Sequence, residues 1–209
     1  MLKKVIFAAA LLVAGQAGAS TILMEDFSGG TNGWTVTGAN SGIVDFGPAA
    51  PGDPALLTED ADNDTIEVYF GNGWSGDLSG YDGGVLSLDF IHGPSLQTSL
   101  IGSFGRITVS GAGDSFKADI YSGAPSFQWQ TASLGFSAAD FGASDADWAN
   151  VIANVDTIQI RLESWGGNTE VVGLDNVHLA AVPLPASALL LLAGLGMLTV
   201  LRRRQSATA

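Results

Sequence analysis

Short runs of alternating apolar and polar residues, separated by turn-forming clusters, constrain the fold of this 209-residue chain more than any other feature. In 66–70, the apolar Ile66, Val68 and Phe70 alternate with polar neighbours. The same period of two recurs in 86–90, 106–110 and 157–163. Each run is typical of a strand with one buried and one wet face, and clusters of Gly, Asn, Asp and Ser mark the turns. About nine or ten such runs predict an all-β fold, an antiparallel β-sandwich of the jelly-roll type.

One stretch departs from this pattern. The segment 137–155 is expected to hold short helical turns, which Ser137 or Ser144 would cap. The rest of the chain shows no internal repeat and no long low-complexity linker. The middle of the chain is therefore interpreted as one β-rich domain.

Charge is divided unevenly along the chain. All 21 acidic residues lie between Glu25 and Asp175, where only Arg106, Lys117 and Arg161 are basic, so this stretch has a formal charge of −18. Such a domain is not expected to bind nucleic acid, because phosphate contacts need a basic surface. It also repels anionic polysaccharides unless calcium bridges them, which favours neutral glycans or cation-dependent contacts. With no cysteine, disulfides and thiolate metal sites are excluded.

Residues 1–19 are predicted to be a secretory signal peptide. Lys3 and Lys4 form a positive n-region, and 5–14 is an apolar stretch too short to span a bilayer. The residues 17–19 fit the A-x-A cleavage pattern, so the mature chain is expected to begin at Ser20. An uncleaved N-terminal anchor is the alternative. In both cases the middle of the chain is expected to be exported.

The C-terminal part is predicted to hold one transmembrane helix. The 20 residues from Val182 to Leu201 carry no charge, and as a helix they would be about 30 Å long, enough to cross the hydrocarbon core. Prolines near the start place the helix at about 186–201, and the arginines that follow are expected on the cytoplasmic side. The chain thus divides into a signal peptide, an extracellular domain at 20–181 and a C-terminal segment at 182–209.

This segment resembles a class of bacterial sorting signals. The order VPLPA, ALLLLAGLG and RRR resembles the VPLPA-CTERM variant of the PEP-CTERM class, over roughly 182–209. The motif residues are Val182, Pro183, Leu184, Pro185, Ala186, Arg202, Arg203 and Arg204. The resemblance implies recognition by an exosortase-type membrane enzyme, cleavage near the proline motif, and transfer of the domain to the cell envelope or outside. Five residues follow the arginines, which departs slightly from the class. A permanent membrane anchor is the alternative, because hydropathy cannot distinguish the two.

The succession of motifs in the middle resembles the laminin B (domain IV) module. EDFSGG at 25–30 leads to Gly33-Trp34, and GLDNVHL at 173–179 closes the stretch. Further segments that carry the resemblance lie at 68–70, 74–79, 81–89, around Trp148 and at 158–161. The opening and closing motifs also resemble those of galactose-binding-like jelly rolls, including many carbohydrate-binding modules. The resemblance covers nearly all of 25–179 and implies a non-enzymatic extracellular β-sandwich that adheres or binds glycans.

Asp175 is the leading candidate metal ligand. The apolar positions around it, Val172, Leu174, Val177 and Leu179, slip by one in their alternation. The slip indicates a β-bulge, which re-aims side chains at sheet ends. In the modules that the chain resembles, an Asp at this place joins an acidic residue of the first strand to hold a structural calcium. The resemblance therefore implies Glu25, Asp26 and Asp175 as oxygen ligands of calcium, although Ser28 stands where many modules have an acidic residue. The alternative is that Asp175 caps a turn.

Trp74 and Trp165 are the predicted sugar-stacking residues. Both stand among Gly, Asn and Ser, in expected loops, where an aromatic face can pack against a sugar ring. Burial in the core is the alternative for each tryptophan. Catalysis has little support, because the chain lacks the G-x-S-x-G, H-E-x-x-H and phosphate-loop motifs, and its only histidines are His92 and His178.

These features predict a non-catalytic, exported protein of the cell envelope or extracellular space. Its β-sandwich is expected to bind or adhere to an extracellular polysaccharide or a surface protein. A purely structural component of an extracellular matrix is the first alternative. A carbohydrate-active hydrolase is the second, since such an enzyme needs only two suitably placed carboxyl groups.

Overall fold

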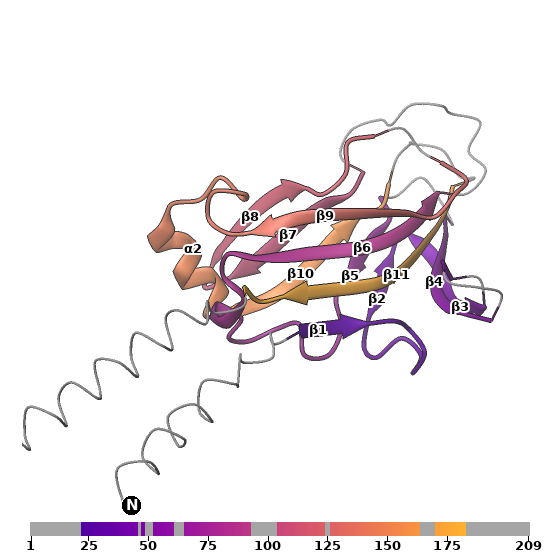
Figure 1. Ribbon diagram of the computed structural model, residues 1–209, viewed down its shortest axis with the longest axis horizontal. Coiled ribbons are helices and arrows are strands. Elements are labelled where there is room, and N and C mark those ends of the chain that lie inside the picture. The colour runs from indigo at the N-terminus through magenta and orange to yellow at the C-terminus, as the bar shows by residue number, and fades with distance from the viewer. Residues whose placement is uncertain are drawn as a thin grey trace, which may run out of the picture. The chain divides into compact units, whose positions relative to one another are not determined.

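In the computed structural model, the described part of the chain is mostly β-structure in two antiparallel sheets (Figure 1). The residues described are 22–45, 47–48, 52–60, 65–92, 104–123, 126–163 and 170–182. Thr21–Ala181 is one compact unit, and it is described by itself. The expected antiparallel β-sandwich is confirmed.

The first sheet has six strands, in the order β3-β4-β11-β6-β9, with β1 also paired to β11. These strands are β1 (Ile22–Glu25), β3 (Ala39–Asp45), β4 (Pro54–Asp60), β6 (Gly84–His92), β9 (Gln130–Phe136) and β11 (Val171–Ala180). The pairing of β11 with β4 covers 171–174, and its pairing with β1 covers 177–180. The first strand of the domain therefore lies beside its last.

The second sheet has five strands, in the order β2-β5-β10-β7-β8. These strands are β2 (Thr35–Thr37), β5 (Glu67–Tyr69), β7 (Arg106–Gly111), β8 (Asp114–Asp119) and β10 (Val155–Arg161). The described residues thus hold eleven strands, slightly more than the sequence pattern predicted. The only helical elements among them are a 3-10 turn at Ser79–Tyr81 and α2 (Asp145–Ile152).

The core lies between the sheets because the strands alternate as the sequence pattern predicts. In β10, Ile158 and Ile160 are buried, while Gln159 and Arg161 between and after them are partly exposed. The same parity holds in β7, where Ile107 and Val109 face the core. Inward residues of both sheets therefore form one hydrophobic cluster, and the five-stranded sheet turns a polar face to solvent.

The predicted bulge in β11 is present. Asp175 lies opposite Asp89 of β6, but the next paired residue is His178, opposite Ser87, so the register shifts between them. Asn176, inside the shift, has a positive φ of 46°, an uncommon backbone state that asparagine tolerates better than most residues. The extra residue lets Leu174 and Val177 both face the core, and each is 0% exposed.

The helix α2 closes one end of the sandwich, beside β7 and β8 (Figure 1). Ser144 is its N-cap and accepts a hydrogen bond from the Asp147 amide, as one of the two predicted caps. Trp148, Val151 and Ile152 form its buried side. Within the ranges described, no helix is long and apolar enough to cross a membrane. The predicted signal peptide and the segment from Pro183 onward lie outside those ranges.

Candidate functional site

Asp175 is a buried carboxyl group whose hydrogen bonding is incomplete. Its side chain is 0% exposed. Oδ1 accepts a hydrogen bond of 2.7 Å from the Asn176 amide, while Oδ2 has no hydrogen-bond partner in the described structure. Burial raises the pKa of Asp175 to about 7, against the lowering effect of the Asn176 amide, and the negative charges of Asp53, Asp89 and Asp26 raise it further. Near neutral pH, this group either keeps its proton or needs a cation.

The other two predicted calcium ligands lie at the end of β1, close to the bulge. Glu25 is opposite Val177, and Asp26 is near enough for its charge to act on Asp175. Glu25 is buried and accepts hydrogen bonds from the Phe27 amide and from Nδ2 of Asn32. The Glu25 carboxylate therefore already has partners inside the β1–β2 loop.

Asp26 also has local partners. Its Oδ1 accepts hydrogen bonds from the amide (3.0 Å) and the hydroxyl (2.7 Å) of Ser28, and these bonds lower the pKa of Asp26. The described residues contain no group of three His, Cys, Asp or Glu side chains arranged to hold a metal. The fold thus brings the predicted residues to one region, where Oδ2 of Asp175 is a buried oxygen without a hydrogen-bond partner.

The structure corrects the prediction for Trp74. Trp74 is 2% exposed and packs edge-on against Trp34 (5.8 Å between ring centroids) and Phe70 (5.0 Å). Its ring is part of the core and cannot stack on a sugar. The Gly and Ser neighbours indicated a loop correctly, but they do not determine whether the Trp74 side chain points to solvent or to the core. Trp165, the second candidate, lies outside the described residues, in the connection from β10 to β11.

Trp129 is the described tryptophan that keeps partial exposure. It directly precedes β9, and its ring lies across the outer face of the six-stranded sheet, over Gly173 of β11. A Cβ atom at Gly173 would lie 3.0 Å from Cη2 of that ring and 2.7 Å from Cγ2 of Ile91. The absence of a side chain at Gly173 therefore makes room for the tryptophan. Sequence reasoning missed this arrangement because it depends on strand order.

The outer face of the five-stranded sheet is lined by polar side chains. Strand register places its side chains in two rows that cross all five strands. One row is Thr35, Tyr69, Gln159, Thr108 and Lys117. The other is Thr37, Glu67, Arg161, Arg106 and Asp119. We call these ten residues the outer rows. Neighbouring strands are about 4.8 Å apart, so each row presents polar groups at that spacing.

Hydrogen bonds fix part of the outer rows. Glu67 accepts one from the Tyr69 hydroxyl (3.1 Å) and one from Nε2 of Gln159 (3.2 Å). Burial, and then the bond and charge of Glu67, raise the pKa of Tyr69, which keeps the hydroxyl protonated. Nε of Arg106 donates to Oδ1 of Asp119 at 2.8 Å. The rows therefore combine an aromatic ring, which can pack against a sugar ring, with hydrogen-bond donors and acceptors in fixed positions, which can bind sugar hydroxyls.

A second group of ionisable residues is buried where β4, β6, β10 and β11 begin or end. Nε2 of His92 contacts Oε1 of Glu170, and Asp60 is 7% exposed nearby. Oε2 of Glu163 accepts a hydrogen bond from the Ile66 amide. Burial raises the pKa of Glu163 to about 7, and the charges of Glu170 and Asp60 raise it further, although the Ile66 amide and Arg161 lower it. No sequence motif marks this group, because its members come from distant strand ends.

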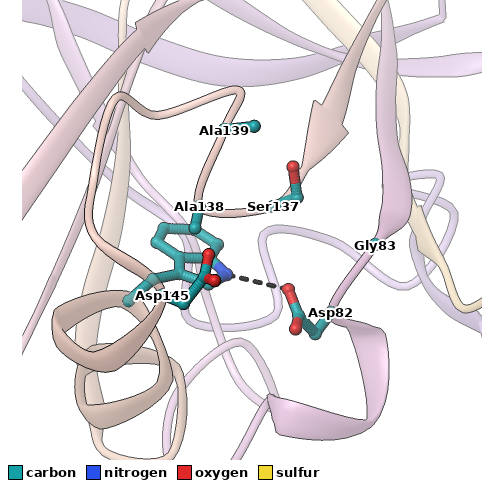
Figure 2. A pocket seen from close by; sticks show the side chains of 7 residues that line it. Asp82, Gly83, Ser137, Ala138, Ala139 and Asp145 are labelled. Carbon is teal, nitrogen blue, oxygen red and sulfur yellow. Dashed lines mark hydrogen bonds between the residues drawn. The ribbon is translucent and has the colours of Figure 1, made fainter.

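A small recess lies beside α2, at the opposite end of β6 from His92. Figure 2 shows Asp82, Gly83, Ser137, Ala138, Ala139 and Asp145 around it, and Trp148 also lines it. Nε1 of Trp148 donates to Oδ1 of Asp82 at 2.9 Å. Its volume of about 260 Å³ is below the range of about 300–1,000 Å³ that is usual for ligand pockets. The recess is therefore a weaker candidate than the outer rows.

The fold and the exposed polar face define the class of this domain as a two-sheet β-sandwich, and comparison with solved structures agrees. The chain is similar to an exo-β-agarase, with a TM-score of 0.58 and 15% identity over 80% of this chain and 25% of that one. It is also similar to the L4b domain of human laminin α-2, with a TM-score of 0.53 and 12% identity over 79% of this chain and all of that domain.

A third similar structure is the family 11 carbohydrate-binding module from Clostridium thermocellum, in complex with a β-1,3-1,4-mixed-linked tetrasaccharide. The TM-score is 0.50 and the identity 17%, over 79% of this chain and 98% of the module. The chain spans only a quarter of the agarase but nearly the whole of the module and of the laminin domain. No family model matches the chain, and no curated protein sequence matches it. At these identities the comparisons establish the fold.

Proposed function

We propose that this chain is an exported protein whose β-sandwich binds glycans without catalysing a reaction. The observation that carries the proposal is the outer face of the five-stranded sheet. Its outer rows present the Tyr69 ring, the Gln159 amide and the hydroxyl groups of Thr35 and Thr37 at strand spacing. A linear polymer can lie along such a surface and exchange its water contacts for these groups. The similarity to a carbohydrate-binding module supports this use of the fold.

The burial of the perturbed carboxyl groups supports a non-catalytic role. Glu163 and Asp175 are the described acidic residues whose pKa is raised to about 7. A glycosidase needs such an acid, but at a position where it reaches the glycosidic bond. Glu163 is 5% exposed and Asp175 is 0% exposed. Their raised pKa is therefore better explained by burial than by catalysis.

Export and processing belong to the same proposal. We infer that residues 1–19 direct secretion and that an exosortase-type enzyme recognises VPLPA, the membrane helix at about 186–201 and the arginines. The domain would then be anchored transiently before it reaches the envelope or the outside. Val182, the first motif residue, is 55% exposed and only two residues beyond β11. This position leaves the start of the motif accessible to a processing enzyme.

A structural calcium ion at the bulge is the cofactor that we propose. Oδ2 of Asp175 is the oxygen that fits a cation, because it is buried without a hydrogen-bond partner. Asp26 is the second ligand of the set, and Glu25 would have to give up hydrogen bonds to Asn32 or Phe27. Bound calcium would neutralise the charge of Asp175 and stabilise the loops beside the bulge.

Glycan binding is tested with the full chain in a non-ionic detergent on an array of neutral and acidic glycans. We expect a subset of linear glycans to bind, and Tyr69→Ala to weaken that binding by about tenfold. Ring contacts in proteins are worth on the order of 0.5–1.5 kcal/mol, and about 1.4 kcal/mol corresponds to tenfold in affinity. Phe127→Ala is the matched control, since Phe127 is 60% exposed but lies outside the five-stranded sheet. Equal losses in both variants, or no binding to any glycan, would contradict the proposal.

A further inference from the structure

The three basic residues of the domain share one surface. Arg106, Lys117 and Arg161 come from three different strands, and all three belong to the outer rows. The remaining five basic residues of the chain are in its terminal segments, at 3–4 and 202–204. One face of a domain with 21 acidic residues therefore holds all of its positive side chains.

These positive groups are close neighbours. Arg161 of β10 lies directly opposite Arg106 of β7, and Lys117 of β8 lies opposite Thr108 of β7. At about 4.8 Å between strands, the three cations span a distance of roughly 10 Å across the sheet. Like charges at this spacing repel each other. Their proximity therefore lowers the stability of the folded domain unless negative charges lie beside them.

The acidic residues in the same rows compensate only part of this charge. Asp119 pairs with Arg106, and both side chains are about half exposed (47% and 40%), so solvent weakens the pair. Glu67 already accepts hydrogen bonds from Tyr69 and Gln159. Nε of Arg161 is buried without a hydrogen-bond partner in the described structure, and the Arg161 charge also acts on Glu163. The outer rows hold three cations against two carboxylates, Glu67 and Asp119, and so carry a net positive charge.

The neighbouring groups indicate what kind of anion fits. Tyr69 and Gln159, both partly exposed, lie in the row beside the arginines and suit uncharged sugar hydroxyls. Arginine binds planar carboxylates through paired hydrogen bonds. The large hydrophobic side chains exposed in the described structure, Ile22, Met24, Val85, Phe127 and Val182, all lie outside this sheet. A polymer with both hydroxyl and carboxylate groups matches the surface better than a lipid layer does.

We propose that the outer rows bind an acidic polysaccharide, a linear glycan with carboxylate groups, and that Arg161, Arg106 and Lys117 contact those carboxylates. This inference rests on the proposed glycan-binding function and names its ligand class. It also revises the expectation that the acidity of the domain favours neutral glycans. The overall charge of −18 acts at long range, where salt screens it, whereas the three cations act at contact distance.

The test compares two forms of one polymer. The full chain in a non-ionic detergent is titrated with polygalacturonate and with its methyl ester, which has the same backbone without the charges. We expect at least about tenfold tighter binding to the free acid at low salt, because charge-assisted hydrogen bonds exceed neutral ones by about that factor. Raising the salt from about 0.1 M to about 1 M, which shortens the Debye length from about 10 Å to about 3 Å, should abolish most of this preference.

Two variants locate the effect. Arg161→Gln should weaken the binding of the free acid by about tenfold, and so remove most of its preference over the ester. Ser133→Asp is the matched control, because it changes the net charge by the same amount on an exposed position of β9 in the other sheet. Ser133→Asp should leave the affinity for the free acid within about twofold of that of the unmodified chain, because salt screens a charge on the other sheet.

Other outcomes would overturn the inference in distinguishable ways. Equal binding of acid and ester, unaffected by salt or by Arg161→Gln, would contradict the acidic ligand class while leaving the proposed glycan binding in place. Binding of neither form would overturn this inference, and failure of the whole glycan array would then overturn the proposed function as well. Salt-sensitive self-association that Arg161→Gln abolishes, without polymer binding, would identify the acidic surface of a second copy as the partner and contradict the proposal.

Discussion

Replacing Trp148 with alanine should lower the free energy of unfolding by about 3–5 kcal/mol, the range observed when a large buried aromatic side chain is removed. Trp148 is 1% exposed and is stacked on Phe141 at 4.8 Å, with Phe136 edge-on at 5.2 Å. Its indole Nε1 also donates to Asp82. The substitution would leave a cavity between α2 and both sheets and remove this hydrogen bond.

Urea unfolding of the 20–181 domain measures the effect, and Trp148→Phe is the control. Phenylalanine keeps most of the ring packing but cannot donate to Asp82, so we expect a loss of about 1–2 kcal/mol. A small domain is typically stable by about 5–15 kcal/mol, which makes the alanine variant marginal. A loss below about 1 kcal/mol for Trp148→Ala would contradict the packing described for α2.

In the absence of calcium, the domain should become less stable as the pH rises from about 4 to about 7. The pKa of Asp175 is raised from 3.8 to about 7 in the folded domain. Over this range the folded state therefore keeps a proton that the unfolded chain releases, and stability falls with pH. A shift of about three units corresponds to about 4 kcal/mol at most. Glu163, with its pKa raised from 4.5 to about 7, acts in the same direction.

Thermal unfolding across this pH range, in excess chelator, separates the two groups. Asp175→Asn cannot ionise and should remove the part of the slope that belongs to Asp175, while Glu163→Gln removes the other part. Calcium should raise the midpoint more at about pH 7 than at about pH 5, because it binds the ionised carboxylate and stabilises the folded state by mass action. This calcium effect should vanish in Asp175→Asn and persist in Glu163→Gln. A calcium effect that survives Asp175→Asn would exclude the proposed site.

Local patterns predicted much of the fold. The slip among Val172, Leu174, Val177 and Leu179 indicated the bulge at Asp175, because a strand with one buried face can change parity only by adding a residue. Ser144 indicated the start of α2 for a similarly local reason, since its side chain caps an amide three residues away. The period of two also indicated that Gln159 and Arg161 face outward.

Strand order could not be predicted from these patterns, and the sites depend on it. Arg106 and Arg161 become neighbours only because β7 and β10 are adjacent, although 55 residues separate them in the chain. The surroundings of Trp74 and Trp129 could not be predicted from local patterns either. The loop around Trp74 folds its ring onto Trp34 and Phe70, whereas Trp129 reaches across the outer face of the six-stranded sheet.

Mapping a bound glycan onto the sheets tests the glycan-binding account most directly. Backbone amide chemical shifts of the 20–181 domain would be recorded with and without the tightest-binding oligosaccharide from the array. The account predicts that the shifts gather on β5, β10, β7 and β8, around Tyr69, Gln159 and Arg161. Shifts that gather instead on β6, β9 and β11 around Trp129, with none in the outer rows, would contradict it.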